Sequence, residues 1–178
     1  MMINSLTVLL VLLLSVKWAL ACDEPKFCEE NKKYCITREK FRERCPCTCA
    51  ADVSLKECCA QQSFEQPTCQ KLCTYGLTES MIRSMVLICF NDFAKLQYCA
   101  SNGYQDSTEC CRQNGVTEDS PDKPGCSIFC QGKMPPCSRM MEYAHCATGP
   151  ALSKAFACAK SAFDHPRWTP NAPVNQCT

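Results

Sequence analysis

Apolar residues recur at helical spacing in the middle of the chain, just after Gly76. The members of this stripe are Ile82, Met85, Val86, Cys89, Phe93 and Leu96. Steps of three and four residues place side chains on one face of an α-helix. Thr78 carries the hydroxyl that is preferred at an N-cap. The pattern therefore predicts a helix that follows Thr78 and buries Cys89 in its apolar stripe.

A second stretch of helical spacing lies near the C-terminus, and a proline divides it. Gly149-Pro150 should end a short helix that begins near Ser138, because proline breaks a continuous helix. A further helix should run from there to about Asp164. Its apolar face consists of Leu152, Ala155, Phe156, Ala159 and Phe163, with Cys158 in the same segment. Residues 166–178 contain three prolines and are expected to form an extended tail.

The cysteines form two copies of one pattern. Each copy has a doubled cysteine, a variable gap, a C-x-x-x-C step, a fifth cysteine after fifteen further residues, and a sixth. The first copy consists of Cys58, Cys59, Cys69, Cys73, Cys89 and Cys99, and the second of Cys110, Cys111, Cys126, Cys130, Cys146 and Cys158. Such a repeat indicates a duplicated structural unit.

Local signals place the repeated cysteines on short helices. Ser54 and Asp106 each precede a glutamate by three residues, which is the spacing of a capping box before the doubled cysteine. A proline precedes each C-x-x-x-C step and a glycine follows it, which predicts a short helix between them. The two thiols of each step then share one helix face, so each should bond to a neighbouring helix rather than to the other.

Composition indicates an oxidising compartment, since 20 of the 178 residues are cysteine. Residues 1–21 resemble a signal peptide: the apolar run is too short to span a bilayer comfortably, and Ala19-Leu20-Ala21 has the small-x-small pattern of a cleavage site. A membrane anchor is the alternative, although Lys17 interrupts the run. We predict a secreted protein without a membrane span after cleavage.

The first segment after the leader, residues 22–50, holds six cysteines and too little apolar surface to fold by packing alone. The two remaining cysteines of the chain, Cys137 and Cys177, belong neither to this segment nor to a repeat copy. We predict that they pair and attach the proline-rich tail to the body, which should stabilise the fold by about 3–4 kcal/mol.

Charge and side-chain chemistry exclude several functions. Removing residues 1–21 removes one of 19 bases and none of 18 acids, so the remainder is neutral, which argues against nucleic acid or an acidic membrane as the main partner. Arg38 to Arg44 is the one dense charged run, and it mixes both signs. His145 and His165 are the only histidines, and we interpret them as surface or cap residues. No catalytic residue, metal or cofactor is expected, since paired cysteines supply neither thiolate nucleophile nor ligand.

Two segments resemble known families. Residues 58–163 resemble the DB module of nematode secreted and cell-surface proteins, which carries twelve cysteines, and the step from Cys110-Cys111 to Gly115-Val116 matches that family closely. The resemblance implies an extracellular setting, six bridges and no established activity. Residues 22–50, with an acid after Cys22 and Cys-Pro-x-Thr-Cys at the end, resemble the ShK-toxin-like module, although the last three cysteines are spaced differently.

These features predict an all-α, disulfide-rich fold in which two copies of a short-helix, six-cysteine repeat pack as one domain. The expected boundaries are 22–50 for the N-terminal segment, 54–165 for the repeat module and 166–178 for the tail. The leading hypothesis is a non-enzymatic module that binds an extracellular or cell-surface protein through loops 61–67 and 115–124, which differ in length between the copies.

Two alternatives remain open. The first is a toxin-like or host-directed effector that acts through residues 22–49, where Lys33-Tyr34 supplies a basic and aromatic pair. The second is a small lipid carrier, because methionines are adaptable apolar residues that could line a groove. The methionines concerned are Met81, Met85, Met134, Met140 and Met141.

Overall fold

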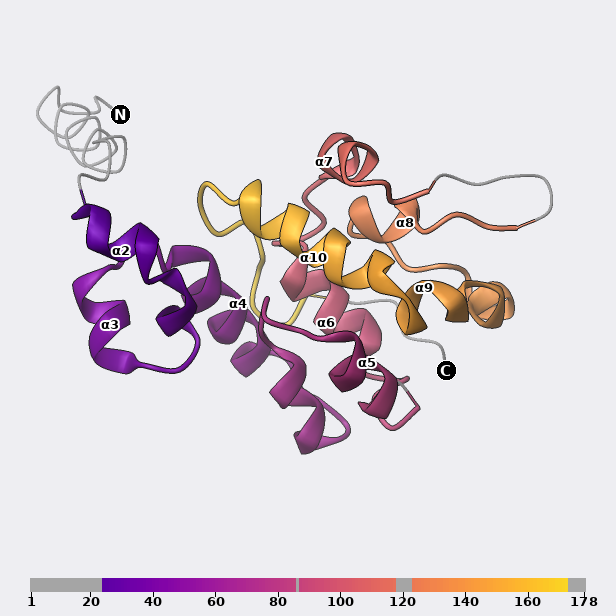
Figure 1. Ribbon diagram of the computed structural model, residues 1–178. Helices are drawn as coiled ribbons and strands as arrows, with labels where there is room; N and C mark the ends of the chain where they lie inside the picture. The colour runs from indigo at the N-terminus through magenta and orange to yellow at the C-terminus, as the bar shows by residue number, and fades with distance from the viewer. Residues whose placement is uncertain (1–23, 86, 118–122, 173–178) are drawn as a thin grey trace, which may run out of the picture.

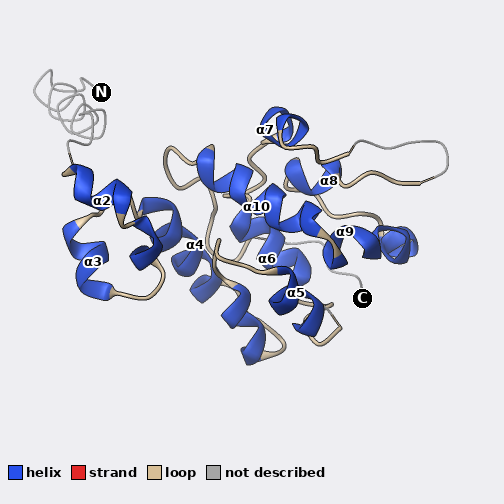
Figure 2. Cartoon of the chain, viewed as in Figure 1, coloured by secondary structure: helices blue, strands red, loops and turns tan. Residues whose placement is uncertain are grey.

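The computed structural model describes residues 24–85, 87–117 and 123–172, and the regular elements in this part of the chain are helices joined by loops (Figures 1 and 2). The α-helices are α2 (Lys26–Glu30), α3 (Glu39–Arg44), α4 (Ala50–Gln61), α5 (Glu79–Met85), α6 (Phe93–Ala100), α7 (Thr108–Gln113), α8 (Ser127–Cys130), α9 (Ala144–Thr148) and α10 (Pro150–Ser161). The 3₁₀ helices are η1 (Lys32–Cys35), η2 (Pro67–Leu72) and η3 (Cys137–Tyr143). The all-α, disulfide-rich fold class is confirmed.

The expected signal peptide, Met1 to Ala21, lies outside the described residues, as does Cys22. None of the helices in the described ranges is long and apolar enough to cross a membrane.

The two repeat copies have the same bridge order. In the first copy the bridges are Cys58–Cys99, Cys59–Cys73 and Cys69–Cys89. In the second copy they are Cys110–Cys158, Cys111–Cys130 and Cys126–Cys146. In both copies, the first residue of the doubled cysteine is bonded to the sixth cysteine, in the last helix, and the second residue is bonded to the second cysteine of the C-x-x-x-C step. The first cysteine of that step is bonded to the fifth cysteine. Each C-x-x-x-C step thus ties two neighbouring elements, although Cys73 lies just after η2 and Cys126 just before α8, so the predicted shared helix face is wrong.

Helix α6 lies at the centre of the packed repeats. All eight of its residues are buried, and Figure 1 shows it in the middle of the molecule behind α10. One hydrophobic core extends from Leu55 in α4 to Cys158 in α10, so the two copies share a single interior. Gln97 in α6 donates a hydrogen bond of 2.6 Å to the backbone oxygen of Phe129, which joins the first copy to the second.

The single helix predicted after Thr78 is wrong in its length. Thr78 accepts a hydrogen bond from the backbone N–H of Met81, as an N-cap should, but α5 ends at Met85 and the chain turns before α6 begins at Phe93. Cys89 is buried in this turn and bonded to Cys69. Val86 is outside the described residues. Helical spacing continued through the turn because two successive helices both face the same core.

The carboxylate of Asp92, the residue before α6, is buried and binds a distant loop. This side chain is 1% exposed and accepts hydrogen bonds from the backbone N–H groups of Glu65 (2.8 Å) and Gln66 (2.9 Å). It also pairs with Lys95 at 3.1 Å. The loop at residues 61–67 is therefore held against the start of α6 instead of projecting into solvent.

The capping box predicted at Ser54 is wrong, because α4 begins four residues earlier, at Ala50. Ser54 lies inside this helix, and its hydroxyl accepts a 2.8 Å hydrogen bond from the indole N–H of Trp168. The prediction at Asp106 agrees better with the observed helix start. Its carboxylate accepts a 2.8 Å hydrogen bond from the backbone N–H of Thr108, the first residue of α7.

Of the proline and glycine signals around the C-x-x-x-C steps, Pro67 and Gly132 mark helix boundaries, whereas Pro124 precedes α8 by three residues and Gly76 follows η2 by four. Pro67 is the first residue of η2, which is a 3₁₀ helix and ends at Leu72. In the second copy α8 begins at Ser127, so Cys126 is its N-cap. Gly132 has φ +68° and donates to the Phe129 oxygen while the next N–H reaches the Ile128 oxygen, which is a Schellman ending.

Replacing Gly132 with alanine should destabilise the protein by about 2 kcal/mol, because an added Cβ would lie 2.6 Å from the Ser101 hydroxyl and 2.7 Å from the Tyr104 Cα at a positive φ. Gly115→Ala is the matched control. Gly115 has a similar φ of +71°, and a Cβ added there would lie 4.0 Å from the Lys154 ammonium. It should cost about 1 kcal/mol. Denaturant unfolding measures both, and equal losses would contradict the steric contribution.

The start of the proline-rich tail is attached to the body by polar contacts. Asn102, which has φ +52°, donates to the His165 oxygen (2.8 Å) and accepts from the Arg167 N–H (3.0 Å). The Tyr98 hydroxyl accepts a 2.9 Å hydrogen bond from the Thr169 N–H. Cys137 is disulfide-bonded, but Cys177 lies outside the described residues, so the Cys137–Cys177 pairing stays a prediction.

The N-terminal segment has its own small core. Cys28–Cys45 and Cys35–Cys49 are bonded, and Cys47 is also in a disulfide. Phe41 packs between the rings of Phe27 and Tyr34 at centroid distances of 5.9 and 5.8 Å. This cluster is separate from the core of the repeats, and α4 connects the two (Figure 1). The boundaries at residues 22–50, 54–165 and 166–178 stay predictions, and α4 runs across the first of them.

Candidate binding surface

Large apolar side chains are exposed together at one place on the repeat module. Leu87, Ile88 and Phe90, in the turn between α5 and α6, are 86%, 56% and 38% exposed. Met141, in η3, is 78% exposed. Leu87, Phe90 and Met141 line the same cavity, which brings the turn and η3 together. We call these four residues the apolar rim. Contiguous exposed apolar surface commonly marks an interaction site.

The cavity at the apolar rim has a volume of about 140 Å³. Its lining is almost wholly apolar and consists of Leu87, Phe90, Phe93, Phe129, Met134, Met140, Met141, Tyr143, Ala144, Ala147 and Thr148. Three of its rings pack edge to face, with centroid distances of 6.1 Å from Phe93 to Phe129 and 6.4 Å from Phe129 to Tyr143. Residues from both repeat copies therefore form one pocket.

Crosslinks hold both sides of the apolar rim. The Cys69–Cys89 bridge fixes the turn between Ile88 and Phe90. On the other side, the Cys126–Cys146 bridge fixes α9, which supplies Ala144, Ala147 and Thr148 to the cavity. A site supported in this way can bind with little loss of conformational entropy.

Charged side chains beside the cavity are paired with each other. Arg83 donates a 2.8 Å hydrogen bond to the Thr148 oxygen and pairs with Glu79 at 3.3 Å. Arg139 pairs with Glu142 at 2.9 Å. The site is thus an apolar pocket bordered by neutralised ion pairs, which resembles the apolar centre and polar border of a protein interface.

The methionine prediction is correct for three of its five residues. Met134, Met140 and Met141 line the cavity, whereas Met81 and Met85 are partly buried against the core. Sequence reasoning missed the exposed turn because Leu87 and Ile88 lie beside a buried stripe. The usable signal was that Leu87, Ile88 and Phe90 flank Cys89 on both sides, so a helix would have had to expose several of them.

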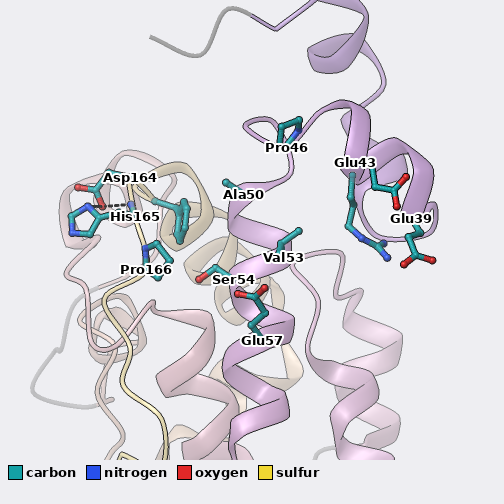
Figure 3. A pocket seen from close by; sticks show the side chains of 12 residues that line it. Glu39, Glu43, Pro46, Ala50, Val53, Ser54, Glu57, Asp164, His165 and Pro166 are labelled. Atoms are coloured by element: carbon teal, nitrogen blue, oxygen red, sulfur yellow. Dashed lines mark hydrogen bonds and ion pairs between the residues drawn. The ribbon is translucent and has the colours of Figure 1, made fainter. Parts of the chain in front are cut away.

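A larger and more open cleft of about 460 Å³ lies between the N-terminal segment and the repeats (Figure 3). Figure 3 shows side chains from α3, from the start of α4 and from residues 163–166 around it. Its acid–histidine pair is engaged locally: Asp164 contacts His165 at 3.1 Å and Arg167 at 2.8 Å. Hydrogen bonds from Arg167 lower the pKa of Asp164 to about 2.

Neither histidine is placed for nucleophilic catalysis. The Nε2 atom of His145 lies 3.4 Å from the Cys146 sulfur and 3.7 Å from the Cys126 sulfur. These three residues are close enough to hold a metal ion, but the two sulfurs are bonded to each other and offer no thiolate ligand. Among the described residues no cysteine has a free thiol, so a Cys–His catalytic pair is excluded there.

The sequence predicted that two loops, 61–67 and 115–124, bind the partner, and the structure describes the first of them more fully than the second. Loop 61–67 is tied to Asp92 and carries no exposed large apolar side chain. Loop 115–124 includes residues 118–122, which lie outside the described residues. The apolar rim is a better-defined candidate than either loop.

Comparison with known families agrees with this architecture. The DB module family model matches residues 58–159, which is more than half of the chain. The chain therefore belongs to the DB module family, a family of extracellular cysteine-rich domains. No curated protein and no solved structure matches the chain. The match does not extend to residues 22–50, so their resemblance to the ShK-toxin-like module stays a prediction, as does a nematode origin.

Proposed function

We propose that this protein is a secreted, non-enzymatic module that binds an extracellular or cell-surface protein through the apolar rim. The observation that carries the proposal is that three exposed apolar side chains, Leu87, Phe90 and Met141, line a crosslinked apolar cavity, with the exposed Ile88 beside them in the same turn. Membership of an extracellular family and the many bridges support secretion.

The size of the cavity supports a protein partner over a lipid. A cavity of about 150 Å³ accommodates a benzene-sized group, and this one has about 140 Å³. Pockets for small-molecule ligands usually have about 300–1,000 Å³. The cavity therefore suits one apolar side chain of a partner, while Leu87, Ile88 and Met141 contact the surface around that anchor. This is the arrangement of an interface hot spot.

The toxin-like alternative has less support from the geometry. The Lys33 ammonium lies 5.3 Å from the centre of the Tyr34 ring, and the Arg38 guanidinium lies 4.2 Å from it. Tyr34 also packs edge to face on Phe41. The ring is therefore engaged within its own segment, and a pore-blocking role for this pair is not proposed.

The test is capture from a secreted proteome with the disulfide-bonded protein and its Leu87→Glu/Met141→Glu variant. Both side chains are well exposed, so the substitutions should leave the fold intact. Placing two carboxylates at the apolar centre should weaken partner binding at least about 30-fold. Partner affinity is then measured by surface plasmon resonance, and a photo-crosslinker at Ile88 identifies the partner segment that lies at the cavity.

The matched control is Gln61→Glu/Gln70→Glu, which adds the same charge at exposed positions away from the cavity. It should bind the partner like the parent protein. Capture of the same proteins with equal affinity by both variants would contradict the proposal. So would crosslinking only to a second copy of this chain, because that outcome would make the apolar rim a self-association surface.

A further inference from the structure

The fold of the N-terminal segment places the charged side chains of the run from Arg38 to Arg44 around two hollows. An open concavity of about 440 Å³ lies over one side of α3, and its lining consists of Phe27, Arg38, Glu39, Lys40, Phe41 and Arg44. Arg42 and Glu43 instead line the cleft toward α4, and Glu39 borders both hollows (Figure 3). Three cations and one acid of this run therefore line the concavity.

These cations have no carboxylate partner in the described part of the chain. The neighbouring bases Lys26 and Lys32 pair with Glu30 and Glu29, but no ion pair joins Arg38, Lys40 or Arg44 to an acid among the described residues. Lys40 and Arg44 are four residues apart on α3, where like charges repel. The unpaired basic side of α3 is therefore available to an external anion.

Aromatic rings position the two guanidinium groups. Arg44 lies 5.1 Å from the centre of the Phe27 ring, and Arg38 lies 4.2 Å from that of Tyr34. Lys33 approaches the same Tyr34 ring at 5.3 Å. Phe41 packs between both rings, and two bridges close the segment. The rings that contact the cations are therefore held in place.

We propose that this concavity binds a sulfated polysaccharide. Guanidinium groups present planar donor pairs that match sulfate oxygens as they match carboxylate and phosphate. A run dense in Lys and Arg is a recognised pattern for polyanion binding, heparin included. The open shape suits an extended chain that passes several cations in turn, and Phe27, 44% exposed, offers an apolar face to a sugar ring. This site is separate from the apolar rim.

Other polyanions fit less well. Phe27 is the one exposed large apolar side chain that lines the concavity, whereas a membrane-binding surface combines bases with a wide apolar face. Nucleic acid is a poor match to the oxidising compartment that the disulfides indicate.

The experiment measures affinity of the disulfide-bonded protein for heparin. The Arg38→Gln/Lys40→Gln/Arg44→Gln variant should lose about 20-fold, which corresponds to three exposed charge contacts. The control Arg83→Gln/Arg112→Gln/Arg139→Gln removes the same charge at exposed sites that already have acidic partners, and should stay within about threefold of the parent. Thiol titration and circular dichroism verify the fold of each variant.

Two measurements on the parent protein do not depend on any variant. Its affinity for heparin should fall at least about tenfold between 50 and 200 mM salt, as expected when several ionic contacts release counterions. Chemically desulfated heparin should bind poorly. Absence of heparin binding, equal losses in both triple variants, equal binding of desulfated heparin, or stronger binding to phosphatidylserine vesicles would each overturn the proposal.

Discussion

Replacing Asp92 with alanine is expected to destabilise the protein by about 4 kcal/mol. The carboxylate is 1% exposed and satisfies the backbone N–H groups of Glu65 and Gln66 together with the Lys95 ammonium. Its removal would leave two backbone donors without their partner and would leave the Lys95 ammonium with the Ser63 oxygen but no carboxylate; breaking a buried pair typically costs about 3–5 kcal/mol. Denaturant unfolding monitored by circular dichroism gives the difference in free energy of unfolding.

Two further variants separate the origins of this effect. Asp92→Ala/Lys95→Met removes the charge left behind, so it should be less destabilised than Asp92→Ala alone. Asp164→Ala breaks an exposed pair with Arg167 and should change stability much less. A loss below about 1 kcal/mol for Asp92→Ala would show that Asp92 does not hold loop 61–67 in place.

Removal of the Cys58–Cys99 bridge by alanine substitution of both cysteines is also expected to cost about 4 kcal/mol. The bridge joins α4 to the buried helix α6 and closes a loop with a sequence separation of 41. In the chain-entropy account, closure of a longer loop contributes more because it restricts the unfolded chain more strongly. The change is measured by denaturant unfolding under non-reducing conditions.

The Cys59–Cys73 bridge provides the comparison within the same repeat copy. Its separation is 14, so its removal should cost about 3 kcal/mol. The two bridges share a neighbourhood, and their difference therefore reports mainly on loop length. If the variant without Cys58–Cys99 were as stable as the parent protein, packing of α6 alone would account for the fold.

Much of the fold could be predicted because helical periodicity and cysteine spacing are local signals. Pro150 ends one helix and begins the next, and Thr78 caps α5, as their chemistry requires. Two errors came from contacts between distant residues. The expected long helix is interrupted before Asp92, whose buried carboxylate binds the loop at residues 65–66. Ser54 accepts a hydrogen bond from Trp168, which is 114 residues away in sequence, instead of capping a helix.

The candidate site was only partly predictable for a related reason. The sequence identified methionines as possible groove residues, but spacing alone could not separate Met140 and Met141 at the cavity from Met81 and Met85 at the core. Leu87 belongs to an apolar run whose period does not reveal that the chain turns away from the core there. The sequence of the charged run at residues 38–44 likewise did not show which of its side chains share a surface, whereas in the structure Arg38, Lys40 and Arg44 line one hollow and Arg42 and Glu43 line another.

The bridge order has a consequence for biosynthesis. The three bridges of the first copy lie between residues 58 and 99, and the three of the second lie between residues 110 and 158. A chain that enters an oxidising lumen from its N-terminus can thus complete the first set before Cys110 emerges from the ribosome. Order of synthesis then reduces mispairing between the duplicated cysteines, a protection that refolding of the full-length reduced chain would lack.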